Sequence, residues 1–330
     1  MKTIGAIAGG GVLAGRAGAR PGPPATPSRG PKQVLAIEAY HDHHTGEHGF
    51  ELNRSVIDAG WTTLIFDNQT DHSHFVYAAK VPVDHEDFQP AEGQSLLEYY
   101  VEEVTIPFQG LMDLLLGETP RHDPTLPDWF GTVVPAGGTG LTAGGLTAKT
   151  TIDLAPGEYI VECYVKESNP PYEDFHSYHG MIEHVTVRDR PAGTSPPRAD
   201  LALTVDNGGM VFDTDAIGRP GRHTVKIDIE EQQAYPNLLG HDAHLIRLEG
   251  STTADDVNGW MNWMAPGELV SDGSDPTTFL GGVETMWPAA LPATAYVDVT
   301  LTPGEYAWVS EVPDPIGEGL FVPFDVPRGR

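Results

Sequence analysis

The sequence predicts an all-β protein built from two tandem Greek-key β-sandwiches, the first of which carries a short helical insertion. Its 330 residues are enough for two domains with their own cores. Glycine and proline are abundant, at 38 and 29 residues, and the apolar runs are short, which is typical of turn-rich β proteins. Several segments of the first half also recur, in the same order, in the second half.

These recurring segments indicate an internal duplication. The clearest pair shares a Pro-Gly turn that leads into an alternating strand, LAPGEYIVEC in the first copy and LTPGEYAWVS in the second. The order of turns and strands in each copy is typical of a Greek-key sandwich of seven or eight short strands. Three pairs of segments correspond: residues 154–163 with 301–310, 59–77 with 220–248, and 126–135 with 275–284.

The domain limits follow from composition. We place a first domain at residues 33–189 and a second at 198–327, because the Pro-rich stretch 188–200 between them has linker chemistry. Residues 1–32 contain an early lysine, a short apolar run and an Ala-Gly-Ala before Arg20, which predicts an export signal followed by a Pro-rich arm. A disordered tail is the alternative for this segment. Export would make the protein secreted, and extracellular, bound to the cell surface or periplasmic.

One stretch, residues 92–117, has helical rather than strand spacing. We expect the helix to end at Pro107, because proline lacks the amide hydrogen that a helix interior requires. The apolar side chains that would share one face of this helix are Leu96, Leu97, Tyr100, Val101 and Val104.

The net charge of −28 limits the choice of partners. Such an acidic surface repels nucleic acid and anionic membranes, so neither is an expected partner. No apolar run is long enough to span a bilayer. The acidity also suits a saline environment.

Cys163 is the only cysteine in the chain, so no disulfide can form within it. In an oxidising compartment a lone thiol is explained by burial, by pairing with another chain, or by a metal. Strand alternation places Cys163 on the buried face with Tyr159 and Val161, opposite a polar face that contains Glu158, Glu162 and Lys166. An ordinary core cysteine would occupy the same face, and the His-x-x-x-x-Met spacing of His176 and Met181 favours the metal.

The segments DHSHF (71–75), PGEYIVEC (156–163) and FHSYHGM (175–181) resemble those of the cupredoxins, the blue-copper β-sandwich proteins. The resemblance covers about residues 33–187, and residues 198–327 resemble the same fold. It implies a mononuclear type 1 copper site, with one ion in the first domain. The implied ligands are His74, Cys163, His176 and Met181, with His72 and His179 as weaker alternates.

The sequence departs from this family in two places. Twelve residues separate Cys163 from His176, which is more than in most electron carriers of the family, so this insertion must loop out and return. In the second copy, Ser310 stands at the place of Cys163, Pro315 at that of His176 and Leu320 at that of Met181. The second domain is therefore expected to lack blue copper, and His244 to be structural.

The resemblance implies an exported copper-binding protein that transfers single electrons to a redox partner protein, with an exposed edge of His176 as the exit. An oxidase is disfavoured, because the multicopper oxidases flank this cysteine with histidines, whereas Glu162 and Tyr164 flank Cys163. The four histidines of HDHHTGEH (41–48) either recruit metal loosely or lie in a solvated loop. The rival function is a structural protein that self-associates at the cell surface, with Cys163 as core filling.

Overall fold

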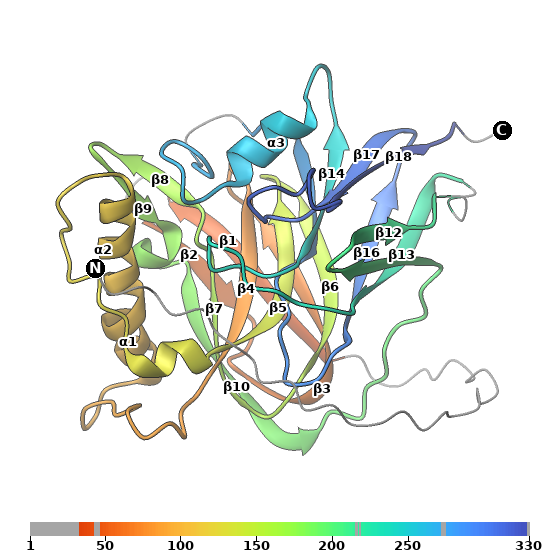
Figure 1. Cartoon of the computed structure of the whole chain (residues 1–330). Coiled ribbons are helices and arrows are strands. Elements are labelled where there is room, and N and C mark those ends of the chain that lie inside the picture. Colours follow the sequence, from red (N-terminus) through yellow and green to blue (C-terminus); the bar gives the residue numbers. More distant parts are fainter. Residues whose placement is uncertain (1–32, 43–46, 215–216, 218, 272–274, 329–330) are drawn as a thin grey trace.

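The computed structural model describes residues 33–328 apart from 43–46, 215–216, 218 and 272–274 (Figure 1). The predicted export signal and Pro-rich arm therefore lie outside the described residues. The strands of the first half are β1 (Gln33–Asp42), β2 (Glu47–Leu52), β3 (Val56–Asn68), β4 (His74–Val81), β5 (Val134–Thr142), β6 (Thr147–Leu154), β7 (Gly157–Glu162), β8 (Lys166–Asn169), β9 (Tyr172–Phe175) and β10 (Ile182–Pro191).

The second half repeats the same kind of architecture. Its strands are β11 (Leu201–Asp206), β12 (Gly209–Phe212), β13 (Gly221–Ile229), β14 (Ala243–Leu248), β15 (Thr278–Val283), β16 (Ala293–Leu301), β17 (Gly304–Val309) and β18 (Phe321–Val326). The helical segments of the chain are α1 (Leu96–Tyr100), a π-helical turn at Val101–Thr105, α2 (Ile106–Leu115), α3 (Ala254–Met261), and two 3-10 turns at Asp128–Thr132 and His176–His179.

Each half is a sandwich of two layers. In the first half β2–β1–β3–β6 faces β10–β7–β4–β5, and in the second β12–β11–β13–β16 faces β15–β14–β17–β18. The layers join across the halves where β6 pairs with β16 and β5 with β15 (Figure 1). The all-β, tandem Greek-key prediction is confirmed, although the first half has more strands than the seven or eight expected.

The inward residues of each strand form the core, as alternation requires. Leu35 and Ile37 of β1, Phe66 of β3 and Phe75 of β4 are almost fully buried between the two layers of the first half. Residues 192–200, in the predicted boundary region, belong to no strand or helix. The domain limits themselves stay a prediction.

Tyrosines at equivalent turns support the duplication. The Tyr159 hydroxyl donates to the Ala155 carbonyl at 2.8 Å, and the Tyr306 hydroxyl donates to the Thr302 carbonyl at 2.9 Å. In both copies the tyrosine thus holds the turn four residues before it.

One of the three predicted segment pairs is wrong. Residues 128–132 form a 3-10 turn, whereas residues 278–283 form β15. The true counterpart of β15 is β5, because β5 lies beside β4 as β15 lies beside β14. A shared Gly and aromatic content misled the alignment.

The predicted helix forms, but Pro107 does not end it. A capping box between Ser95 and Glu98 starts the helical run, which continues to Leu115. The Ile106 amide bonds to the Val101 carbonyl, which makes the turn before the proline wider than an α-helical turn. The wide turn accommodates the proline ring, and Pro107 then occupies the first turn of α2, where no amide hydrogen is needed.

The helical run covers the outer face of β4, β7 and β10. It contributes Tyr99, Tyr100 and Val104 to a second apolar cluster with Trp129 and Ile160. The face of β7 that was predicted to be polar is therefore partly core.

Lys166, which was also expected on the polar face, is fully buried. It lies beyond the end of β7, at the start of β8, and its ammonium group pairs with Glu173. The burial results from a loop of the second half that packs over it, so local alternation could not reveal it.

That loop follows α3, a helix that the spacing analysis missed. α3 begins with a capping box between Thr253 and Asp256, which was a usable signal in the sequence. Beyond α3, the Leu269 carbonyl accepts the Lys166 amide at 2.9 Å, and the Ser271 amide donates to the Lys166 carbonyl at 2.8 Å. The loop after α3, in the second half, is thereby hydrogen-bonded to the start of β8, in the insertion of the first half. None of the described helices is both long and apolar enough to cross a membrane.

We expect Tyr159→Phe to lower the free energy of unfolding by about 1 kcal/mol, and Tyr306→Phe to lower it by at least as much, because the Tyr306 hydroxyl also accepts the Thr302 amide at 3.1 Å. Urea titrations of both variants would measure this. If only one substitution destabilised the protein, the two turns would not be equivalent.

Candidate metal centre

Three of the predicted ligands meet at one buried point. The Cys163 Sγ lies 3.7 Å from the His74 Nδ1 and 3.9 Å from the His176 Nδ1, and the two nitrogens are 3.1 Å apart. A point equidistant from the three atoms lies about 2.1 Å from each, which is close to metal–imidazole and metal–thiolate bond lengths. All three side chains are buried.

Neighbouring segments bring these residues together. His74 begins β4, and Cys163 directly follows β7, which pairs with β4. The insertion after Cys163 forms the β8–β9 hairpin and returns, as the sequence required. The His176 amide then donates to the Val165 carbonyl at 2.9 Å.

Met181 belongs to the same buried turn. Its carbonyl accepts the Cys163 amide at 3.0 Å, and its amide donates to the His176 carbonyl at 2.9 Å. Gly180 adopts φ 115°, a left-handed conformation that lets the chain reverse just before Met181. Ligation by the Met181 thioether stays a prediction.

The two alternate histidines lie outside the triangle. The His179 Nε2 binds the carboxylates of Glu167, at 3.0 Å, and Asp174, at 3.1 Å. His72 precedes β4 and lines a pocket beside the site. The strand parity that His72 shares with His74 could not separate them, but the fold does.

Two polar side chains that the sequence analysis missed hold the turn in place. The buried amide of Gln109, on α2, donates to the Glu173 carbonyl at 2.6 Å and accepts the Phe175 amide at 2.9 Å. Ser271, from the second half, lies 3.1 Å from the His176 Nε2. The only sequence signal was a glutamine within an apolar helical stretch.

Burial sets the protonation states at the site. It lowers the pKa of His74 to about 3 and that of His176 well below its ordinary value, and nearby histidines add to both shifts. Both imidazoles are therefore neutral at neutral pH and can each offer a lone pair to a metal. Burial also raises the pKa of the Cys163 thiol to about 12, so a thiolate at this position needs a bound cation.

A pocket of about 170 Å³ adjoins the triangle, and both His74 and His176 contribute to its lining. The expectation of an exposed His176 edge is wrong, because only 3% of this residue is exposed and Ser271 covers its outer nitrogen. The His48 ring packs beside the His176 ring, and their centroids are 5.3 Å apart.

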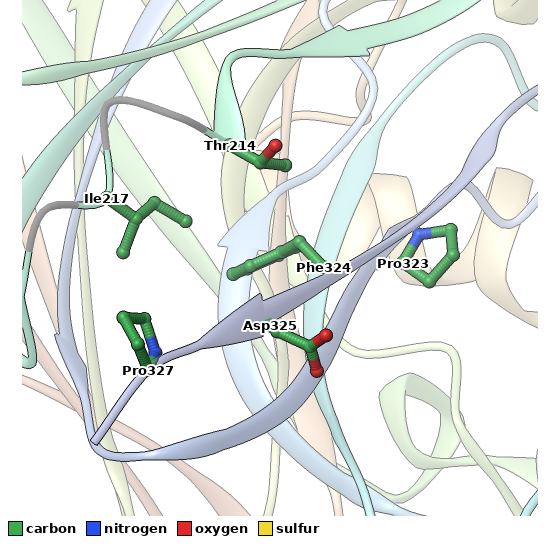
Figure 2. Close-up of a pocket in the computed structure, with 6 residues that line it drawn as sticks. All are labelled: Thr214, Ile217, Pro323, Phe324, Asp325 and Pro327. Atoms are coloured by element: carbon green, nitrogen blue, oxygen red, sulfur yellow. The ribbon is translucent and has the colours of Figure 1, made fainter.

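Part of the predicted His41–His48 cluster lines this pocket. His41 and His48 face each other across the β1–β2 pair, and both contribute to the lining. His43 and His44 lie outside the described residues. A second pocket, of about 500 Å³, lies elsewhere near Ile217 and Phe324 (Figure 2), and Asp325 is the one carboxylate among its described lining residues.

The second half reproduces the backbone of the site without three of its four predicted ligands. The Ser310 amide donates to the Leu320 carbonyl at 3.1 Å, and the Leu320 amide donates to the Pro315 carbonyl at 2.6 Å. These bonds match those among Cys163, Met181 and His176. The structure thus agrees with the predicted alignment, in which soft ligands are replaced by serine, leucine and proline.

We expect Gln109→Leu to lower the free energy of unfolding by about 2 kcal/mol, because a buried carbonyl and a buried amide would lose their partner. Thermal or urea unfolding would measure the change. The control is Gln94→Leu, at a partly exposed position just before α1, whose hydrogen bonds to the Ala91 amide and to Glu102 lie at the surface, and which should change stability by less than about 0.5 kcal/mol. Equal losses of stability in the two variants would argue against the role of the Gln109 hydrogen bonds in holding the turn.

No protein-family model and no curated protein matches the chain. Among solved structures, auracyanin A, a "blue" copper protein from Chloroflexus aurantiacus, has a TM-score of 0.26 and 18% identity, covering 48% of this chain and all of its own. Copper nitrite reductase from Nitrosomonas europaea has a TM-score of 0.22 and 14% identity, covering 89% of this chain and 93% of its own. A multicopper oxidase has the same TM-score and 13% identity, covering 89% and 88%. Because these TM-scores and identities are low, the tandem Greek-key fold rests on this chain's own strand order, and the candidate site rests on its own side chains.

Proposed function

We propose that the protein holds one copper ion in its first half and transfers single electrons through it. The observation that carries this proposal is the buried triangle of one sulfur and two imidazole nitrogens. A thiolate, two imidazoles and a nearby methionine are the ligand types of a type 1 copper site. Copper bound there would supply a one-electron redox couple.

The residues around the triangle suit a site that changes little between redox states. The Cys163 sulfur accepts backbone hydrogen bonds from Phe75 and Val165, which favour the thiolate. With copper on its Nδ1, the His176 ring would carry its proton on Nε2 and donate it to Ser271, 3.1 Å away, which would fix the ring. Met181 would be the axial ligand. A rigid, dry shell of this kind keeps the ligand geometry constant.

The pocket beside His74 and His176 is the natural route for an electron. Its histidines, His41, His48 and His72, bring the protein surface closest to the two imidazoles. The strongly acidic chain would favour a cationic redox partner. We further propose that the protein is exported, on the pattern of residues 1–32.

The neighbours of Cys163 support a carrier rather than an oxidase. Glu162 accepts a hydrogen bond from Tyr100 at 3.3 Å, and the Tyr164 hydroxyl donates to Glu311 at 3.1 Å. Neither position offers an imidazole that would connect the thiolate to further copper ions.

We expect Cys163→Ser to abolish both the colour and the stoichiometric copper of the loaded protein, because the thiolate is the ligand that gives blue copper its absorption. Visible absorption and metal analysis after copper loading would test this. The matched control is Ser310→Ala, at the equivalent position of the second half, which should keep both. A colourless wild-type protein would instead support the structural cell-surface function.

We expect Ser271→Ala to keep the colour but to weaken copper binding about 10-fold or more, because the His176 ring would lose the partner that orients it. Competition with a chelator would measure the affinity. Unchanged affinity in this variant would mean that the second half does not support the site.

A further inference from the structure

We infer that the protein has a second metal site, in its second half, which binds a divalent cation mainly through carboxylates. Its residues are Asp242, His244, Glu284 and Glu311, whose potential ligand atoms all lie within 4.8 Å of one another. They come from neighbouring strand ends: just before and within β14, after β15 and after β17.

The four side chains are buried and incompletely partnered. None is more than 2% exposed. Five of their polar atoms have no hydrogen-bond partner: the Asp242 Oδ2, the His244 Nε2, both Glu284 carboxylate oxygens and the Glu311 Oε1. Buried polar groups are nearly always satisfied, so this many open atoms in one place indicates a missing ligand.

Three of the four side chains are anchored through their remaining polar atom, which holds their open atom in position. The Asp242 Oδ1 accepts the Glu311 amide at 2.9 Å, and the Glu311 Oε2 accepts the Tyr164 hydroxyl at 3.1 Å. The His244 Nδ1 accepts the Leu141 amide at 3.0 Å. Carboxylates with one oxygen anchored and the other free are typical of residues that ligate metals.

Charge makes a cation necessary if these groups are ionised. No lysine or arginine of the described chain pairs with Asp242, Glu284 or Glu311, and His244 is the nearest basic group. Three buried carboxylates without a counter-charge would be strongly unfavourable. Burial, followed by repulsion from Asp242, raises the pKa of Glu284 and of Glu311 well above the ordinary value.

The ligand atoms that remain available determine which metal ion suits the site. Because the His244 Nδ1 accepts a backbone amide, a neutral ring carries its proton on Nε2, directed toward Asp242 at 3.6 Å, and oxygen atoms remain as the main ligands. Four free oxygens are fewer than the six to eight that Ca²⁺ prefers. Mn²⁺ takes six oxygen ligands in octahedral geometry, which these four oxygens and two waters would complete without the seventh and eighth ligands that Ca²⁺ often takes, so we choose it as the probe.

This site does not depend on the proposed copper function. The strand register makes His244 the counterpart of Tyr77, because Arg247 pairs with Tyr306 as Lys80 pairs with Tyr159, so the four residues do not occupy the positions of the predicted copper ligands. The two sites are nonetheless linked in space, because the Tyr164 hydroxyl donates to Glu311 and Tyr164 directly follows Cys163.

The experiment is to unfold the full chain with chelator, refold it with Mn²⁺ alone, remove free ion by gel filtration and count manganese per chain. We expect one Mn²⁺ in the wild type and in Cys163→Ser, and none in Glu284→Gln or Asp242→Asn, two variants that remove charge and keep shape. The Mn²⁺ should also raise the melting temperature of the wild type but not of these variants.

Circular dichroism shows whether the amide variants fold. The inference is overturned if the wild type retains no Mn²⁺, or if the folded amide variants retain as much as the wild type. Displacement of Mn²⁺ by an equal concentration of Ca²⁺ would overturn the choice of ion. Loss of copper binding in Cys163→Ser with Mn²⁺ retained would separate the two sites, so failure of one leaves the other standing.

Discussion

The convergence of one sulfur and two imidazole nitrogens on a single buried triangle is the constraint around which the first half is built. The backbone bonds that tie Cys163 to Met181 and Met181 to His176 fix the turn that carries the triangle. The helical insertion holds β9 through the hydrogen bonds of Gln109, and Ser271 of the second half covers the outer nitrogen of the His176 ring. Both the helical insertion and the second half therefore support the segments that carry the sulfur and the two nitrogens of the triangle.

Because the two halves repeat the same fold, equivalent backbone arrangements carry different polar side chains in each half. Both copies keep the tyrosine-held turn and the paired amides at Cys163 or Ser310, because these bonds stabilise the sandwich whatever the side chains are. The side chains beside that backbone then changed independently. In the first copy they are soft donors suited to copper, whereas in the second the nearest donors are carboxylates, which favour a harder ion.

The two halves also depend on each other. The sheets are continuous through β6–β16 and β5–β15, and the loop after α3 pairs with Lys166 at the base of the insertion. Conversely, Tyr164 and Leu141 of the first half anchor Glu311 and His244 of the second. Each candidate site is therefore completed by residues from the other half, which gives a physical reason for two sandwiches in one chain.

The sequence by itself determined the all-β class, the two copies, the inward face of Cys163 and the residue types of the triangle, because turns, alternation and ligand spacing are local properties. It ranked His74 above His72 and His176 above His179, but alternation alone could not separate them, since which rings meet depends on contacts across strands. It missed α3, Ser271 and the burial of Lys166, and it ended the helix at Pro107, because long-range packing and a widened turn decide these features. Only the tertiary structure brought Asp242, Glu284 and Glu311 together, since carboxylates this far apart in sequence become one cluster only when their strands are adjacent.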